Sequence, residues 1–428
     1  MTAGGDGTRH GGSGLMALGP AEATAAMRVA LVYDIDACKG PTGVTRHALA
    51  QLDGLRQRAG IDLRLVSGRL TEPDGLAFWE SLNGLVRCEL PLRTRNALRW
   101  WRLHPWPPVE WWAGEVDWVY SPAEYGVPTR GGRRAVTVHD VLQMIRYRPP
   151  SHRERLARTL AEADLVLSVS RFNTDRLLEH FPDCAGRVEY VPNGAEDLFF
   201  EPATPLERSA APDDLGLPAG LPYLLSVANF EARKNLDRLV RAAARLPEVA
   251  AGALALVLLG TGTDAEERTL RHEVARVDRR AVIRLPGYRQ GKPLRAAYAG
   301  ASALVFPSLC ESFGIPAVEA MAQRVPVALA NSTALPEIAG AAGWYFDPTN
   351  EDAITETLTA LLSLPDDRAR RVELGRTRAE GYRWQAATDR LVEALSAYLH
   401  QPRRPASVSA TSPPRRSSLS DWLQGRSS

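Results

Sequence analysis

The chain of 428 residues is poor in cysteine and has no long apolar run. Its four cysteines are widely scattered, with neither CxxC spacing nor nearby histidines, so that no disulfide framework and no zinc site is indicated. We therefore expect a reducing, cytoplasmic setting. No segment reaches the length that a membrane-spanning helix requires. The formal net charge of +2 gives no bulk electrostatic reason for a nucleic-acid partner, and none is predicted.

Lysine is also scarce. It occurs only at Lys39, Lys234 and Lys292, and arginine supplies all the other members of a set of 52 basic residues. In a chain that otherwise uses arginine, each lysine is a candidate for a specific role. The position of Lys234, described below, makes it the strongest of the three.

The glycine fingerprint of dinucleotide-binding proteins is missing. The first predicted strand of the chain is followed by Lys39-Gly40-Pro41-Thr42-Gly43-Val44, and the first strand of the second half is followed by Ala228-Asn229-Phe230-Glu231. Neither segment contains GxGxxG, which counts against a dinucleotide-dependent oxidoreductase. We predict no bound cofactor.

What the chain does contain is two successive rounds of short β-rich runs that alternate with helical patterns. Such alternation predicts an α/β protein with two doubly wound, Rossmann-like parallel sheets and a cleft between them. The predicted strands are Val29–Asp34, Leu63–Val66, Trp118–Tyr120, Ala135–His139, Leu165–Ser168 and Val188–Val191, then Tyr223–Val227, Leu254–Leu259, Val282–Leu285, Ala303–Phe306 and Val325–Ala328. The predicted parts are a disordered leader (1–27), a first domain (28–200), a linker (201–221), a second domain (222–381), a C-terminal helix (382–401) and a disordered tail (402–428).

The most informative motif runs from Glu311 to Glu319, through Ser312-Phe313-Gly314-Ile315-Pro316-Ala317-Val318. It follows a predicted buried strand, and Pro316 suits the first turn of a helix. Glu311 then lies in the loop before the helix, and Glu319 lies on the order of 6 Å along its axis from Ile315. The free N–H groups of Phe313 and Gly314 between them form a ready anion site. This spacing suits a sugar nucleotide, with the diphosphate on the amides and a carboxylate at each end. The alternative is a surface helix with two solvated glutamates.

Two cations lie near the N-terminus of another predicted helix. Arg233-Lys234-Asn235 follows the first strand of the second domain and precedes a helix over Leu236–Arg245. Cations at that end of a helix are unfavourable unless an anion lies between them. A bound phosphate would supply that anion, whereas the alternative is a pair of solvated basic residues.

The first domain offers weaker signals. His139 ends a predicted strand and would face the cleft, where it could bind a sugar hydroxyl, although a histidine at a strand end is more often structural. Gly40 and Gly43 would let the backbone approach a phosphate closely. Asp34 and Asp36 have the spacing of a metal-binding DxD, but the cations and the helix N-terminus can neutralise a diphosphate, and no metal is predicted.

One basic and aromatic stretch carries five tryptophans between Trp100 and Trp112, interleaved with arginine and proline. These side chains could stack on sugars, contact an anionic membrane surface, or pack in the core. Ordinary packing is favoured, and peripheral contact with an anionic membrane at the inner face of the plasma membrane remains open.

Several of these motifs, in this order, resemble the retaining glycosyltransferases of family 4, which have the GT-B fold. The resemblance runs from about Arg28 to Leu399. It rests on the glycine-containing first loop, Val138-His139-Asp140, Ser168-Val169-Ser170, Val191-Pro192-Asn193-Gly194, Arg233-Lys234-Asn235 and the Glu311/Glu319 pair. The Arg-Lys-Asn tripeptide and the segment Ser332-Thr333-Ala334-Leu335-Pro336-Glu337 are most similar to the sequences of the bacterial mannosyltransferases that build surface polysaccharides.

The resemblance implies a role for each matching residue on the donor side. Arg233 and Lys234 would hold the donor diphosphate, together with the amides of Phe313 and Gly314. Ile315, at the start of the helix, belongs to the same nucleotide site.

Further implied contacts complete the site. Glu311 would contact hydroxyls of the donor sugar, Glu319 the ribose, and His139 the sugar from across the cleft. Gly43 would lie beside the phosphates, and the loop Tyr288-Arg289 would read the base. The last helix, Trp384–Leu399, would cross back to the first domain. One departure is Ala228-Asn229, where many relatives place a phosphate-binding arginine.

The implied reaction is a metal-independent transfer of a hexosyl group, best taken as mannosyl from GDP-mannose, to a glycan or lipid-linked acceptor. The stereochemistry would be retained. A sugar-nucleotide epimerase of the same fold would need its own acid and base carboxylates, and a phosphorylase a cofactor-bearing lysine, for which only Lys292 is left. A catalytically silent nucleotide-sugar-binding protein would keep the helix site but would not need Arg233 and Lys234.

Overall fold

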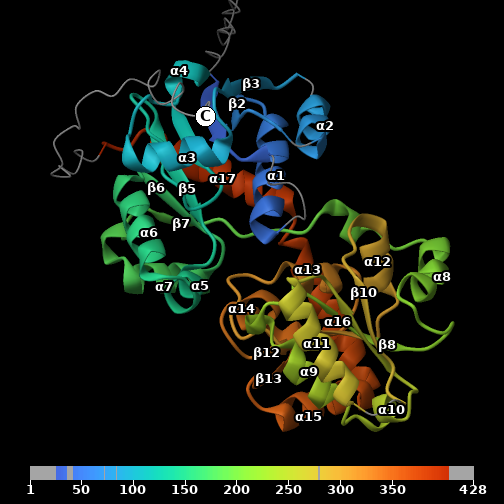
Figure 1. The fold of residues 1–428 in the computed structure, drawn as a ribbon. Coiled ribbons are helices and arrows are strands. Elements are labelled where there is room, and N and C mark those ends of the chain that lie inside the picture. The colour runs from blue at the N-terminus through green and yellow to red at the C-terminus, as the bar shows by residue number, and fades with distance from the viewer. Residues whose placement is uncertain (1–25, 36–41, 72, 83, 278–279, 404–428) are drawn as a thin grey trace, which may run out of the picture.

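The computed structural model describes residues 26–35, 42–71, 73–82, 84–277 and 280–403. These residues form two α/β domains, each built on one parallel sheet with helices on both faces (Figure 1). The predicted α/β, doubly wound architecture is thereby confirmed. Most of the expected leader and tail, together with Asp36 and the stretch from Lys39 to Pro41, lie outside the described residues.

The first domain contains a seven-stranded sheet with the order β3-β2-β1-β4-β5-β6-β7. All its neighbouring strands pair in parallel, and the strand order reverses between β1 and β4, which is where such sheets bind ligands. The strands are β1 (Met27–Val32), β2 (Ile61–Gly68), β3 (Val86–Leu90), β4 (Trp118–Ser121), β5 (Arg133–Val138), β6 (Leu165–Ser168) and β7 (Val188–Tyr190).

The second domain contains a six-stranded parallel sheet with the order β10-β9-β8-β11-β12-β13. Its order reverses between β8 and β11, and the loops after these two strands carry the Arg-Lys-Asn and Glu311 motifs. The strands are β8 (Tyr223–Val227), β9 (Ala255–Leu259), β10 (Ile283–Gly287), β11 (Ala303–Phe306), β12 (Val327–Ala330) and β13 (Gly343–Phe346).

The helices of the described residues cover these sheets. Those of the first domain are α1 (Gly43–Arg56), α2 (Pro73–Ser81), α3 (Thr94–Leu103), α4 (Glu110–Ala113), α5 (Val141–Tyr147), α6 (Pro150–Glu162) and α7 (Arg171–His180). Those that follow are α8 (Pro205–Asp214), α9 (Leu236–Ala243), α10 (Pro247–Ala250), α11 (Asp264–Arg276), α12 (Gly291–Ala299), α13 (Ile315–Ala322), α14 (Leu335–Ala339), α15 (Glu351–Ser363), α16 (Pro365–Glu380) and α17 (Trp384–Leu399). Within the described part of the chain, no helix has the length and apolarity needed to cross a bilayer.

Two strands were not predicted, and both lie at sheet edges. β3 is half exposed and carries Arg87 and Glu89, so that it lacks the continuous apolar run of a buried parallel strand. β13 begins with Gly343 and is only four residues long, so its sequence is more typical of a loop than of a strand. Within the segment expected as a linker, α8 forms a helix with a capping box at Thr204.

The chain passes between the domains twice, and the two crossings lie side by side. Ala195 donates a backbone hydrogen bond to Tyr382 and bridges to Arg383. A Cβ at Gly194 would lie only 2.6 Å from the backbone nitrogen of Trp384, which explains the glycine of the Val-Pro-Asn-Gly motif. From there α17 runs onto the first domain, where Leu391 and Leu395 join its core.

Glu337 of α14 forms a second link between the domains. Its carboxylate oxygens accept hydrogen bonds from the backbone N–H groups of Arg171 (2.8 Å) and Phe172 (2.9 Å), the first residues of α7. A helix N-terminus carries partial positive charge, so a carboxylate there is stabilising. Glu337 therefore favours the arrangement in which the two domains are close together.

Glu337→Ala is expected to shift the ligand-free protein towards a more open arrangement. The contact is of the order of 1–2 kcal/mol, so its loss changes the ratio of closed to open molecules roughly tenfold. Small-angle scattering should show a larger radius of gyration for this variant than for the wild type. Glu373→Ala, which removes an exposed ion pair with Arg324 inside the second domain, is the matched control. An unchanged radius in Glu337→Ala contradicts the expectation.

Candidate active site

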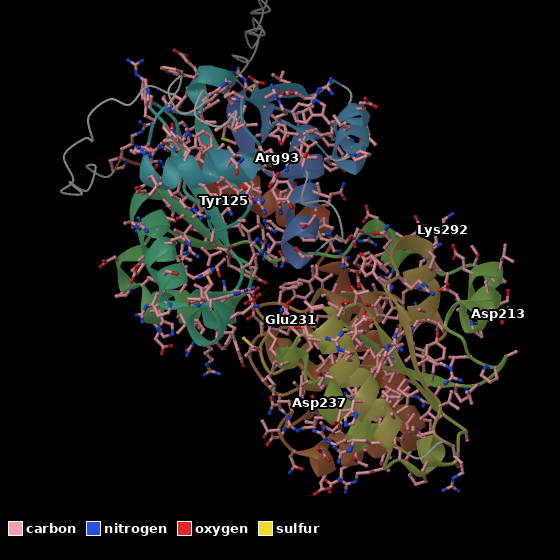
Figure 2. All side chains as sticks on the ribbon, in the orientation of Figure 1. Arg93, Tyr125, Asp213, Glu231, Asp237 and Lys292 are labelled. Carbon is pink, nitrogen blue, oxygen red and sulfur yellow. The ribbon has the colours of Figure 1, made fainter. Side chains whose placement is uncertain are left out.

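A cavity of about 1150 Å³ lies between the two domains, at the carboxyl ends of their strands. All the residues to which the family resemblance assigns a role in the site line this cavity: Gly43, His139, Arg233, Lys234, Tyr288, Arg289, Glu311, Phe313, Gly314, Ile315 and Glu319. Gly40 lies outside the described residues. Glu231, which also lines it, marks in Figure 2 the side of the second domain that faces the first. The fold thus brings together residues that are up to 276 positions apart in the sequence, as between Gly43 and Glu319.

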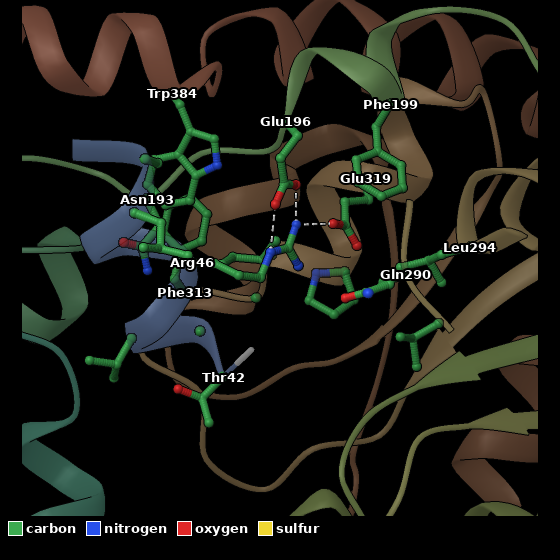
Figure 3. Close-up of a pocket in the computed structure, with 18 of the residues that line it drawn as sticks. Thr42, Arg46, Asn193, Glu196, Phe199, Gln290, Leu294, Phe313, Glu319 and Trp384 are labelled. Carbon is green, nitrogen blue, oxygen red and sulfur yellow. Dashed lines mark hydrogen bonds and ion pairs between the residues drawn. The ribbon is translucent and has the colours of Figure 1, made fainter. Parts of the chain in front are cut away.

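Two helix N-termini meet across the cavity (Figure 3). α1 begins at Gly43, with Thr42 as its N-cap, and a Cβ at Gly43 would lie 4.0 Å from Ile315 at the start of α13. Gly314, the N-cap of α13, has φ = +106°, a conformation that glycine adopts without strain. Among the described residues, no protein group accepts a hydrogen bond from the amides of Phe313 and Gly314. Both helix ends therefore present positive partial charge to one space.

The Arg-Lys-Asn turn is held by its asparagine. Asn235 lies in the left-handed region (φ = +60°), and its side-chain amide donates to the carbonyls of Pro307 (3.1 Å) and Pro348 (2.8 Å). Asparagine is one of the few residues that tolerate this conformation. The turn therefore holds Arg233 and Lys234 beside the loop that follows β11.

Glu311 is the anion that lies between the two cations. Lys234 Nζ forms a close ion pair with Glu311 Oε1, Ser308 Oγ donates to the same oxygen at 2.6 Å, and Arg233 Nη1 lies 3.6 Å away. Burial alone would raise the pKa of Glu311, but Lys234 and Arg233 outweigh it, and the pKa lies below its ordinary value. The side chain is therefore a carboxylate, able to accept hydrogen bonds.

Both glutamates of the pair are enclosed, so the alternative of two solvated side chains is wrong. Glu311 is 9% exposed and Glu319 is 0% exposed. Glu319 accepts a hydrogen bond from Tyr298 Oη at 2.8 Å, and its other oxygen forms an ion pair with Arg46. Burial raises the pKa of Glu319, and Arg46 opposes that rise.

Arg46 was not predicted from the sequence. It extends from α1 of the first domain and pairs with Glu319 of the second, and its Nε also donates to Glu196 at 2.8 Å in the segment that joins the domains (Figure 3). The sequence did place an arginine one turn into the helix that follows the glycine loop. In a chain so rich in arginine, however, this residue could not be distinguished from the others.

His139 lies at the end of β5 and is buried. Its Nε2–H donates to the carbonyl of Pro122 at 2.9 Å, which leaves Nδ1 as the ring atom that can accept. The rings of His139 and His47 pack edge to face at a centroid distance of 4.7 Å. His47 is fixed by Asn193 (2.9 Å) and by the hydroxyl of Tyr120 (3.0 Å). Burial and the proximity of His139 lower the pKa of His47 well below its ordinary value.

The two residues proposed to read the base differ in their surroundings. Tyr288 is exposed at the cavity. The guanidinium of Arg289 is instead held by Asp214 of α8, whose carboxylate accepts from Nε at 2.7 Å and whose carbonyl accepts from Nη2 at 2.9 Å. Asn229, where the family resemblance would place an arginine, donates to Glu231 at 2.6 Å. The described residues contain no group of three or more His, Cys, Asp or Glu side chains placed to hold a metal.

Comparison with solved structures places the fold in the GT-B class. A glycosyltransferase from Rickettsia africae ESF-5 superposes with a TM-score of 0.71 over 88% of this chain and 100% of its own, at 15% identity, which establishes likeness of fold alone. Residues 207–378 match the family described as glycosyl transferases group 1.

Two curated relatives extend the match along the chain. The O-antigen chain mannosyltransferase B of Escherichia coli is 31% identical over 286 residues, which is 65% of this chain and 74% of the relative. The GDP-mannose-dependent monoacylated alpha-(1-6)-phosphatidylinositol monomannoside mannosyltransferase of Corynebacterium glutamicum is 28% identical over 58% of this chain and 65% of its own. The chain therefore belongs to the group 1 glycosyltransferases and is a transferase enzyme with the GT-B fold.

Proposed function

We propose that the enzyme transfers a hexosyl group, best taken as mannosyl, from a nucleotide-diphosphate sugar to a glycan or lipid-linked acceptor, with retention and without a metal. The observation that carries this proposal is the grouping of Arg233, Lys234 and Glu311 beside the two helix N-termini in one interdomain cavity. Two cations and two sets of free amides suit a diphosphate. A carboxylate beside them suits sugar hydroxyls.

The donor is proposed to lie along α13. Its diphosphate would contact Lys234, Arg233 and the amides of Phe313 and Gly314. Hydroxyls of the sugar would donate to Glu311, whose lowered pKa keeps it an acceptor. The ribose hydroxyls would donate to Glu319, which has room for further hydrogen bonds because each carboxylate oxygen can accept two.

The proposed step needs no carboxylate nucleophile. The bond between the sugar and the diphosphate breaks while an acceptor hydroxyl attacks from the same face, and the departing phosphate oxygen takes the hydroxyl proton. The developing charge falls on the diphosphate, where Arg233 and Lys234 stabilise it. His139 Nδ1 would accept a hydrogen bond from the donor sugar and hold it against the cations.

The donor identity rests on the relatives. Two of them are mannosyltransferases by name, and one is named as dependent on GDP-mannose. The phosphorylase alternative loses support, because Lys292 is exposed on α12 and is not among the residues that line the cavity (Figure 2).

Thermal-shift measurements with GDP, UDP and ADP test the nucleotide part of the proposal. A nucleotide at about 100 times its dissociation constant stabilises the folded state by about 2.7 kcal/mol. GDP is expected to raise the melting temperature more than UDP or ADP. Incubation with GDP-mannose and a glycan or lipid-linked acceptor should then release GDP. If none of the three nucleotides stabilises the protein, the proposed site is wrong; if UDP stabilises it most, only the donor assignment is wrong.

A further inference from the structure

The tryptophan-rich stretch divides into a packed part and an exposed part. Trp101 is buried and its indole N–H donates to the carbonyl of Pro107 at 2.9 Å. In contrast, Trp106 and Trp111 are 56% and 60% exposed, and their rings pack edge to face at 4.7 Å. Leu103, at the C-terminal end of α3, is 75% exposed. Core packing therefore accounts for only some of these side chains.

Arginines gather beside this exposed apolar group. Arg99 and Arg102 lie three residues apart on α3, as Arg155 and Arg158 do on α6, so that each pair shares one side of its helix. Burial and the positive charges of Arg155, Arg99 and Arg158 lower the pKa of Arg102. Within the described residues, none of the four forms an ion pair with a carboxylate. Most arginines of the second domain's helices, in contrast, are paired, as Arg241 is with Glu351. The cluster thus carries unneutralised positive charge.

We call the two groups together the basic–aromatic face: Arg99, Arg102, Leu103, Trp106, Trp111, Arg155 and Arg158. They are connected through α3, because Arg99 and Arg102 lie on that helix and the Trp100 indole N–H donates to the carbonyl of Trp106 at 2.7 Å. In Figure 1, α3 runs across the first domain between α4 and α6. The face belongs to the domain that does not carry the Arg-Lys-Asn and Glu311 motifs.

We propose that the basic–aromatic face docks the enzyme on an anionic lipid bilayer. A bilayer offers negative headgroups to the arginines and, directly beneath them, an interfacial layer in which tryptophan rings and a leucine are favourable. A nucleic acid would satisfy the arginines but would offer no apolar layer to Leu103. Docking is a property separate from the transfer reaction. It would bring the first domain close to a lipid-linked acceptor held in the bilayer.

Vesicle sedimentation with the full-length enzyme tests the proposal. Vesicles that contain phosphatidylglycerol should bind the enzyme, vesicles of phosphatidylcholine alone should bind it far more weakly, and salt should weaken the binding. Each arginine near an anionic surface is worth about fivefold in affinity. The triple variant Arg99→Gln, Arg102→Gln, Arg158→Gln is therefore expected to bind about 100-fold more weakly.

The matched control removes three charges elsewhere. Arg245→Gln, Arg271→Gln, Arg276→Gln alters exposed arginines of the second domain and should leave vesicle binding within a few-fold of the wild type, a tolerance of about one charge. A second, independent variant, Trp106→Ser, Trp111→Ser, should also weaken binding. Lipids brominated on their acyl chains should quench wild-type tryptophan fluorescence, and this quenching should disappear in the tryptophan variant.

Three results would overturn the proposal: equal binding of the two triple variants, equal binding to both kinds of vesicle, or binding to a single-stranded oligonucleotide without binding to vesicles. Vesicle binding requires no sugar nucleotide, so its failure leaves the proposed transfer reaction untouched. Release of nucleoside diphosphate by the variants in solution should equal that of the wild type.

Discussion

Lys234→Ala is expected to lower the rate of donor turnover by about 10²–10³-fold. The ammonium group lies beside Arg233 and Glu311 in the cavity and is nearly buried. In the proposed step, negative charge grows on the departing diphosphate, and a cation held in a site that excludes water stabilises that charge strongly. Initial rates of nucleoside diphosphate release, at saturating donor and acceptor, measure the effect.

A loss of rate in Lys234→Ala could have two causes, because Lys234 also neutralises Glu311. Combining it with Glu311→Gln separates them, since the glutamine no longer needs a counter-ion. If Lys234 acts on the diphosphate, the double variant is at least as slow as Lys234→Ala. Recovery of the double variant to the rate of Glu311→Gln alone would show that Lys234 serves only the glutamate, and the proposed role would fail.

Two further variants serve as controls. Lys234→Arg keeps a cation near the diphosphate and is expected to retain more activity than Lys234→Ala. Lys292→Ala removes a lysine that is exposed on α12, outside the residues that line the cavity, and should leave the rate unchanged. A Lys234→Ala rate within about tenfold of the wild type would contradict the mechanism.

The site features that were predicted correctly from the sequence are those that a single short segment determines. The run from Glu311 to Glu319 and the Arg233-Lys234-Asn235 turn each lie within one strand–loop–helix connection, and parallel sheets direct such loops to one edge. The strands with continuous apolar runs were predicted, whereas the edge strands β3 and β13 were not, because partial exposure removes that run. How the predicted site residues divide the work among themselves stays a prediction until it is tested.

Contacts between segments that are distant in the chain could not be predicted from the sequence. Arg46 meets Glu319 across 273 positions of the chain, and Glu337 meets Arg171 across 166. Both contacts depend on how the two domains approach each other, which no local pattern encodes. Glu337 belonged to a segment that was noted only for its family resemblance, so its place at the N-terminus of α7 is new information from the structure.

Arg46→Met is expected to weaken nucleoside diphosphate binding by roughly ten- to a hundredfold, with the loss greatest on the acid side of neutrality. Arg46 is the cation that lowers the raised pKa of the enclosed Glu319. Without it, burial raises that pKa further, so Glu319 becomes protonated at a higher pH. A protonated carboxyl group accepts ribose hydroxyls poorly, and affinity is lost as the pH falls through the raised pKa.

Glu196→Gln should act in the opposite direction. Glu196 raises the pKa of Glu319 through its negative charge, while Arg46 stays within reach of Glu319 when Glu196 is neutral. The acid limb of the nucleotide affinity profile should therefore move to lower pH in Glu196→Gln and to higher pH in Arg46→Met. Titration of nucleotide binding across a pH series measures both shifts, and the melting temperature of each variant reports whether it is folded.

The opposite signs distinguish electrostatic control of Glu319 from simple damage to the interface between the domains. A purely structural role for Arg46 predicts weaker binding at every pH in both variants, because Arg46→Met removes the bridge between α1 and the crossing segment and Glu196→Gln weakens it. Parallel shifts, or a loss that does not depend on pH, would rule out Glu319 as the titrating group. Opposed shifts would instead mean that Arg46 of the first domain controls the charge of Glu319, the carboxylate proposed to bind the ribose. The contact between the domains and the charge state of the proposed donor site would then depend on the same arginine.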